Sequence, residues 1–178
     1  MSVLYVIFSG SPSARFVPAL VRAAIDRGWT VCAIATPQGT KFASLPELES
    51  LTGYPVRSEY KHPEEPDLLP RADAVVAFPA TFNTLNKWAL GISDTLAVGL
   101  LCEYTGLRMP VVAVPSVMVG GGLDMHPAFG RSLGQLRDYG VHVIHDPQRF
   151  GARNVPPPEV ILNAVDGRLR TPQGPAAC

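Results

Sequence analysis

The chain has 178 residues, and its 15 Lys and Arg residues balance its 15 Asp and Glu residues, so its formal charge is zero. Charged residues make up 17% of the chain, below the roughly 25% usual for soluble domains. Nucleic-acid binding depends on clusters of Lys and Arg that neutralise phosphates, and the sequence has no basic run. The composition therefore predicts one ordinary domain with a buried core and no nucleic-acid partner.

Apolar segments of strand length alternate with segments of helical periodicity. In chain order we expect strand 3–8, helix 16–24, strand 29–35, helix 42–51, strand 54–56, a helical turn near Leu68, strand 74–78, helices 81–89 and 93–104, strand 110–114, helix 127–140, strand 141–144 and helix 160–165. This alternation predicts an α/β fold with a parallel six-stranded sheet between helices. Residues 1–168 are expected as a single domain and 169–178 as a frayed tail.

Other features of the composition narrow the class of protein. No apolar stretch reaches the 18 to 20 residues of a membrane span, and the N-terminus lacks the features of a secretory signal, so we expect a cytoplasmic protein with no membrane partner. Cys32, Cys102 and Cys178 are widely separated, which argues against a disulfide framework and against a metal site. A hydrophobic fraction of 47% with so little charge predicts that copies of the chain cover one another.

Four loops follow expected strands and would meet at one edge of the sheet, where ligands bind in such folds. They read SGSPS, TPQGT, PATFN and PSVMVGGG, and they are rich in small, hydroxyl and amide residues. Backbone N–H groups and helix N-termini in such loops can hold a dianion without a lysine. Neither the G-x-G-x-x-G pattern nor a phosphate loop with its lysine is present, so NAD and ATP do not follow.

Each of these loops also has a purely structural interpretation. The hydroxyl groups of Ser9 and Ser11 can cap the first helix as well as bind phosphate. Thr36 and Thr40 can bind phosphate or form a plain turn beside a core Phe42. Asn83, Asn86 and Asp94 are all suited to helix N-caps, and these alternatives stay open on residue type alone.

One segment makes the interpretation more specific. FPATFNTLNKWALGISDTLA resembles the PA-[ST]-x-N-T-x-x-K-x-x-x-G-[IC]-x-D-[DN]-L signature of the homo-oligomeric flavin-containing cysteine decarboxylases, a family that includes phosphopantothenoylcysteine and peptidyl-cysteine decarboxylases. The matching positions are Pro79, Ala80, Thr81, Asn83, Thr84, Lys87, Gly91, Ile92, Asp94 and Leu96. The segments Thr36 to Phe42, LESLTGYPV and HPAFGRSLGQLRDYGVHVI are also similar to the family, so the resemblance covers roughly residues 2–147.

The resemblance implies a Rossmann-like (flavodoxin-like) three-layer sandwich that binds FMN at a subunit contact. It also implies a homo-oligomer, either a trimer or a dodecamer of trimers, that acts on a small-molecule or peptide substrate. The FMN phosphate and ribityl chain would lie near Ser9, Gly10, Ser11, Thr36, Gly39, Thr40 and Phe42. The flavin ring and the substrate side would be lined by Pro79, Ala80, Thr81 and Asn83, with Asp94 near the cofactor.

Two parts of the family pattern are missing. The family histidine lies fourteen residues before the proline of the PA motif, and Glu65 has that position here, with His62 nearby. The P-x-M-N-x-x-M-W motif is replaced by PSVMVGGG, without an asparagine. Asn83, His62, Glu65 and His126 are therefore the candidate catalytic residues. Candidates for holding a substrate carboxylate are His126, Asp124 and the backbone N–H groups of 120–122.

Three functions follow from this comparison. The first is an FMN enzyme that oxidises or oxidatively decarboxylates a small thiol carboxylate or a peptide C-terminal cysteine, in which the family's flavin turns the thiol into a thioaldehyde so that CO₂ can leave. The second is a non-catalytic FMN-binding regulatory or scaffold homologue, which the missing motifs favour. The third and weakest is a flavin prenyltransferase-like enzyme.

Overall fold

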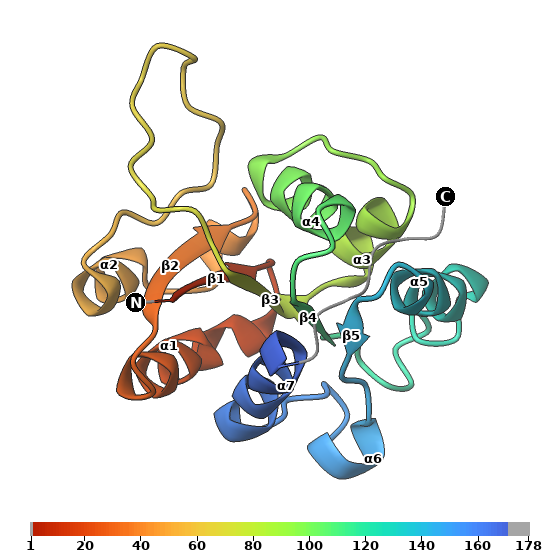
Figure 1. The fold of residues 1–178 in the computed structure, drawn as a ribbon. Coiled ribbons are helices and arrows are strands. Elements are labelled where there is room, and N and C mark those ends of the chain that lie inside the picture. The colour runs from red at the N-terminus through yellow and green to blue at the C-terminus, as the bar shows by residue number, and fades with distance from the viewer. Residues whose placement is uncertain (1, 171–178) are drawn as a thin grey trace.

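The computed structural model describes residues 2–170, which form a parallel five-stranded sheet with helices on both faces (Figure 1). The strands lie in the order β2-β1-β3-β4-β5. Their bounds are β1 Val3–Phe8, β2 Thr30–Ala35, β3 Ala74–Ala80, β4 Val111–Pro115 and β5 His142–Val143. The α-helices are α1 Val17–Asp26, α2 Leu45–Thr52, α3 Phe82–Ala89, α4 Leu96–Gly106, α5 Pro127–Asp138, α6 Pro147–Phe150 and α7 Pro158–Arg170, and the 3-10 helices are Pro12–Phe16 and Gly39–Lys41.

The strands are continuously apolar because both faces of the sheet are covered. All six residues of β1 are buried, and successive side chains point to opposite faces. Leu4 and Val6 pack in one core, whereas Tyr5 and Ile7 pack in the other. The expected α/β architecture with three layers is confirmed.

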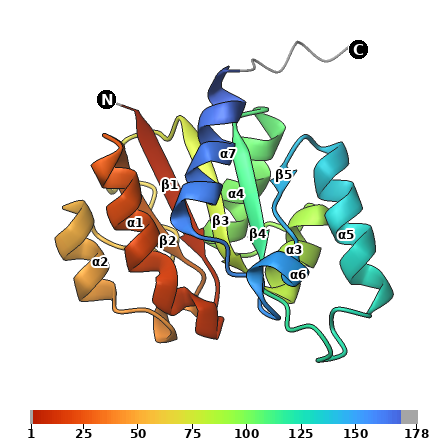
Figure 2. The same cartoon turned by 90° about the horizontal axis from the view of Figure 1, so that it is seen from below.

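Each face of the sheet has its own set of helices. Helices α1, α2 and α7 contribute buried apolar residues to one core, and α3, α4 and α5 contribute to the other. In Figure 2, α7 lies in front of the central strands and α4 lies behind them. Because all five strands are parallel, the loops that follow them emerge at a single carboxyl edge.

Three expectations about secondary structure were wrong. The sheet has five strands, because residues 54–56 form no strand and this segment makes only one bridge, between Ile34 and Arg57. The polar chain after Arg57 leaves the sheet before a ladder can form, and Figure 1 shows the link from α2 to β3 as a long excursion. No helical turn forms near Leu68. The helix expected at 160–165 extends over Pro158–Arg170, so residues 169 and 170 of the expected tail are helical, and 171–178 lie outside the described residues.

Candidate functional site

A cavity of about 590 Å³ opens at the carboxyl edge of the sheet. This volume is typical of sites for small molecules and cofactors. Loops after the first four strands and the segment after β5 contribute to its wall. The lining residues are Gly10, Ser11, Pro12, Thr36, Pro37, Gln38, Thr81, Phe82, Asn83, Thr84, Lys87, Thr95, Val98, Ser116, Val117, Met118, Leu123 and Arg153.

Buried hydroxyl groups connect three of these loops beneath the cavity. The Oγ of Ser116 donates to the Oγ of Ser13 at 2.9 Å and also lies 2.9 Å from the Oγ of Ser11. The Oγ of Ser9 lies 2.9 Å from the Oγ1 of Thr84. These buried side chains satisfy one another, which fixes the loops after β1 and β4 and the first turn of α3 relative to each other.

The loops after β1 and β2 approach each other closely because of two glycines. A Cβ atom on Gly10 would lie 3.1 Å from the Cβ of Gln38, and one on Gly39 would lie 2.7 Å from the carbonyl oxygen of Phe8. The Oγ1 of Thr36 accepts the backbone N–H of Gly39 at 3.0 Å. This side of the cavity is thus a narrow cradle of backbone and hydroxyl groups, which suits an anionic or polar ligand.

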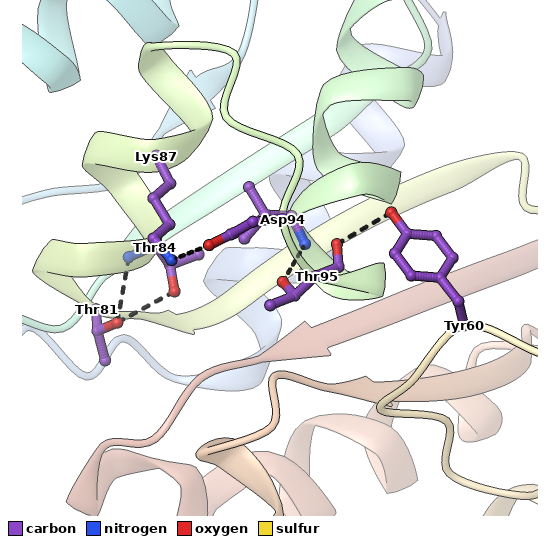
Figure 3. A network of polar contacts seen from close by, with 7 residues as sticks. Tyr60, Thr81, Thr84, Lys87, Asp94 and Thr95 are labelled. Carbon is purple, nitrogen blue, oxygen red and sulfur yellow. Dashed lines mark hydrogen bonds and ion pairs between the residues drawn. The ribbon is translucent and has the colours of Figure 1, made fainter.

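Helices α3 and α4 begin at the mouth of the cavity, and Figure 3 shows the polar contacts there. Thr81 caps α3, and its Oγ1 also lies 3.1 Å from the Oγ1 of Thr84. Thr95 caps α4, and its carbonyl accepts the hydroxyl of Tyr60 at 3.3 Å. Lys87 forms an ion pair with Asp94, an interaction between a lining lysine and an exposed carboxylate (Figure 3). Most of the charge of Lys87 is therefore already balanced.

The glycine loop after β4 is organised by its own carboxylate. The Oδ2 of Asp124 accepts the backbone N–H of Gly120 at 2.8 Å, and the Oδ1 accepts that of Gly122 at 3.0 Å. These hydrogen bonds hold the pKa of Asp124 below its usual value. The N–H of Gly121 is bonded to the carbonyl of Met118. The expectation that these amides hold a substrate carboxylate is therefore wrong, because Asp124 and Met118 already use them.

The structure separates the four candidate catalytic residues. Asn83 lines the cavity from the first turn of α3, and its side chain is exposed there. His62 and Glu65 lie in the excursion before β3, outside the cavity lining, where the N–H of His62 donates to Glu65 at 3.3 Å. His126 caps α5 through Nδ1, which accepts the N–H of Ala128 at 3.1 Å. Its ring packs edge-on against Phe82, a lining residue, so His126 contacts the cavity wall but does not line the cavity.

The candidate cofactor residues divide into two groups. Those that line the cavity are Gly10, Ser11, Thr36, Thr81 and Asn83. Those outside the lining are Ser9, Gly39, Thr40, Phe42, Pro79, Ala80 and Asp94. Several residues of the second group contact a lining residue directly: Ser9 is hydrogen-bonded to Thr84, Gly39 is hydrogen-bonded to Thr36, and Asp94 is paired with Lys87.

Sequence reasoning missed Arg153 as a lining residue. Gln38 and Ser116, which also line the cavity, stand in the loops TPQGT and PSVMVGGG, and the sequence does place these two loops at the carboxyl edge. Arg153 follows the short helix α6, which has no periodicity to reveal it. It gives the cavity a cation that the sequence analysis did not recognise.

Cys32 and Cys102, the two cysteines among the described residues, lie away from this cavity. Burial raises the pKa of the Cys32 thiol to about 11 and also raises that of Cys102. Neither residue lines the cavity.

Within residues 2–170 no cluster of three potential metal-ligating side chains is found. The same residues contain no helix long and apolar enough to cross a membrane.

Comparisons with known proteins agree with this fold. A family model described as Flavoprotein matches residues 2–170. A cysteine/cysteine sulfinic acid decarboxylase from an unknown prokaryotic organism is 37% identical over 103 residues, which are 54% of this chain and 27% of that protein. The coenzyme A biosynthesis bifunctional protein CoaBC of Thermococcus kodakarensis is 29% identical over 165 residues, 90% of this chain and 40% of that protein. The chain thus spans less than half the length of both curated relatives.

Solved structures share the same architecture. The crystal structure of the FMN-dependent cysteine decarboxylase SpaF superimposes with a TM-score of 0.75 at 24% sequence identity. The match covers 95% of this chain and 97% of that structure. The likeness in fold therefore extends over nearly all of both chains.

Proposed function

The chain belongs to the flavoprotein family, and from this premise we propose that it binds FMN in the cavity at the carboxyl edge and oxidises or oxidatively decarboxylates a thiol carboxylate. The observation that carries the proposal is the position of the PATFNT segment. Its Thr81, Asn83 and Thr84 line a cavity of about 590 Å³ together with the loops after β1 and β2. The substrate would be a small thiol acid or a peptide ending in cysteine.

The residues present fit a phosphorylated flavin. Gly10, Ser11 and Thr36 form the narrow cradle of hydroxyl and backbone groups, and they would hold the phosphate and ribityl chain. Thr81 and Asn83 would hold the ring and the substrate side. Asn83 supports this role because the first turn of α3 presents its amide to the cavity while the cap of that helix is made by Thr81.

Bound FMN would supply a two-electron acceptor for oxidation of the thiol-bearing carbon, the chemistry that oxidative loss of the carboxylate as CO₂ needs, with dioxygen or another external oxidant as the final electron acceptor. The chain itself would orient the substrate and exclude water from the deep part of the cavity. The buried hydroxyl groups of Ser11 and Ser116 keep the floor rigid. Phe82 and Met118 would add apolar surface on the substrate side of the cavity.

A second function is favoured by one observation. Among the lining residues of the described chain there is no histidine, aspartate, glutamate or cysteine, and the lining lysine, Lys87, is paired with Asp94. The cavity wall of a single chain therefore offers no unpaired base to a thiol. A non-catalytic FMN-binding homologue would need no such base. Turnover assays with phosphopantothenoylcysteine and with peptides ending in cysteine, followed by loss of CO₂ by mass, separate the two functions.

We expect Asn83→Ala to weaken FMN binding by about tenfold, because a polar partner of the flavin is lost. The free energy of unfolding should change by less than about 0.5 kcal/mol, since Asn83 is exposed. Flavin fluorescence titration of the purified chain measures the affinity, with the exposed helix residue Asn163 changed to Ala as the control. An absence of bound flavin in the wild-type chain after addition of FMN overturns the proposed function. Unchanged affinity and turnover in the variant remove Asn83 from the site.

We also propose that the chain forms a homo-oligomer. Support comes from apolar side chains left at the surface, among them Leu90, Ile92, Leu107 and Tyr139, of which Leu90 is 68% exposed. The expected result of light scattering on the purified protein is a mass of at least three chains of 19.1 kDa. A monomeric mass at micromolar concentration contradicts this proposal.

A further inference from the structure

Arg153 is a cation at the rim of the cavity whose position follows from the segment after β5. It lines the cavity, and its side chain is exposed. The neighbouring Ala152 accepts the N–H of Val119 at 2.9 Å through its carbonyl oxygen. This bond connects the segment to the loop after β4, which supplies Met118 and Leu123 to the cavity wall. Arg153 therefore faces the same space as those two apolar side chains.

A buried asparagine fixes the backbone next to Arg153. The Nδ2 of Asn154 donates to the carbonyls of Pro115 at 2.9 Å and of Ile144 at 2.8 Å, and its Oδ1 accepts the N–H of Asp146 at 2.9 Å. These bonds connect the segment to the ends of β4 and β5. A guanidinium on such an anchored backbone loses less freedom when it binds a ligand than one on a mobile loop does.

The charge of Arg153 is available to a ligand. In the described part of the chain no ion pair is formed by Arg153, whereas the other lining cation, Lys87, is paired with Asp94. The glycine amides that could compete for an anion are bonded to Asp124 and Met118. None of the lining residues within 2–170 is acidic. An anion that enters the cavity on this side would meet Arg153 first.

We propose that Arg153 binds the carboxylate of the substrate and makes the site selective for thiols that carry a free carboxylate; this inference rests on the proposed function. The planar guanidinium matches a carboxylate in a two-point hydrogen-bonded pair. The strand order places the loop after β2 at one edge and the segment after β5 at the other. The cradle of Gly10 and Thr36 is assigned to the cofactor phosphate, so Arg153 is left for the substrate. Met118 and Leu123 would contact the apolar part of that substrate.

The test compares ligands that differ only in the carboxylate. FMN-loaded protein is titrated with a tripeptide in which serine replaces the terminal cysteine, so that the flavin cannot oxidise it, and with the same peptide as its C-terminal amide. Binding is followed by the change in the flavin absorption spectrum. The variants are Arg153→Gln and Arg153→Lys, with Arg149→Gln as the control, because Arg149 lies in the same segment but outside the cavity lining. Affinities for FMN and for riboflavin, which lacks the phosphate, are measured on each protein.

We expect Arg153→Gln to weaken binding of the free acid by roughly 10- to 100-fold, down to the affinity of the amide, as the loss of a charged hydrogen-bonded pair requires. Binding of the amide and of FMN should change by less than about twofold. Arg153→Lys should recover part of the preference, and Arg149→Gln should behave as the wild-type chain.

Three results overturn the inference: a wild-type chain without preference for the acid, an Arg153→Gln chain that keeps that preference, or a loss of FMN affinity without loss of riboflavin affinity, which would assign Arg153 to the cofactor phosphate. Failure of the wild-type chain to bind FMN is a different result, because it rejects the proposed function. Calorimetry with the acid and the amide on the flavin-free chain then still tests Arg153.

Discussion

Replacement of Asn154 by Ala is expected to lower the free energy of unfolding by about 3 kcal/mol, because it leaves several buried backbone groups without partners. Asn154 is fully buried, and its side chain serves the carbonyls of Pro115 and Ile144 and the N–H of Asp146. Its φ angle of 51° is in the left-handed region, which asparagine tolerates better than alanine does. Both effects destabilise the variant in the same direction.

Urea unfolding of the wild-type and variant proteins measures this difference. Asn154→Gly serves as the companion variant, because it removes the same hydrogen bonds but accepts the left-handed backbone, so the difference between the two variants isolates the backbone term. Asn163→Ala on the exposed face of α7 is the control. It loses one exposed hydrogen bond from Arg27, which also pairs with Asp166, so the expected change is below about 0.5 kcal/mol. An Asn154→Ala protein as stable as that control would show that the three hydrogen bonds contribute no net stability.

The fold was predictable because its signals are local. The continuous apolar run Val3–Phe8 forms β1 with the expected bounds, since a strand covered on both faces can be apolar at every position. Residues 54–56 are apolar enough for a strand, but a strand also needs hydrogen bonds to its neighbour over several residues. Here only Arg57 pairs with the edge strand β2. The extent of pairing is a property of the whole sheet, so a short segment does not reveal it.

The site was also predictable in part, because some of its residues follow strands that the sequence itself reveals. Ser11 and Thr36 stand in the loops that follow β1 and β2, so topology alone places them at the carboxyl edge. The roles of Asp124 and Arg153 depend on contacts that residue type does not specify. Three glycines in a row suggest amides free for an anion, yet Asp124 turns back and uses two of them. Arg153 follows α6, a helix too short to show periodicity, and Asn154 rather than any motif fixes its backbone.

Replacement of Gly39 by Ala is expected to lower the free energy of unfolding by about 2 kcal/mol and to weaken FMN binding by about tenfold. The added Cβ would lie 2.7 Å from the carbonyl oxygen of Phe8, a backbone atom at the end of β1 that also accepts the N–H of Thr36 at 2.9 Å. Relief of the overlap requires the loop after β2 to move away from β1. That movement widens the cradle between Gly10 and Gln38, and so it affects the cofactor as well as the core.

Gly134→Ala is the matched control for this prediction. Gly134 lies within α5, and a Cβ there would meet no atom within 4 Å. The same chemical change should therefore raise the free energy of unfolding by roughly 0.5 to 1 kcal/mol, since alanine is the better helix former. Urea unfolding and flavin fluorescence titration on both variants provide the comparison. If Gly39→Ala were as stable as the wild-type chain and bound FMN equally well, the close approach of the two loops would not shape the cavity. If the free energy of unfolding falls in Gly39→Ala and rises in Gly134→Ala, and only Gly39→Ala binds FMN more weakly, the losses come from the contact with Phe8.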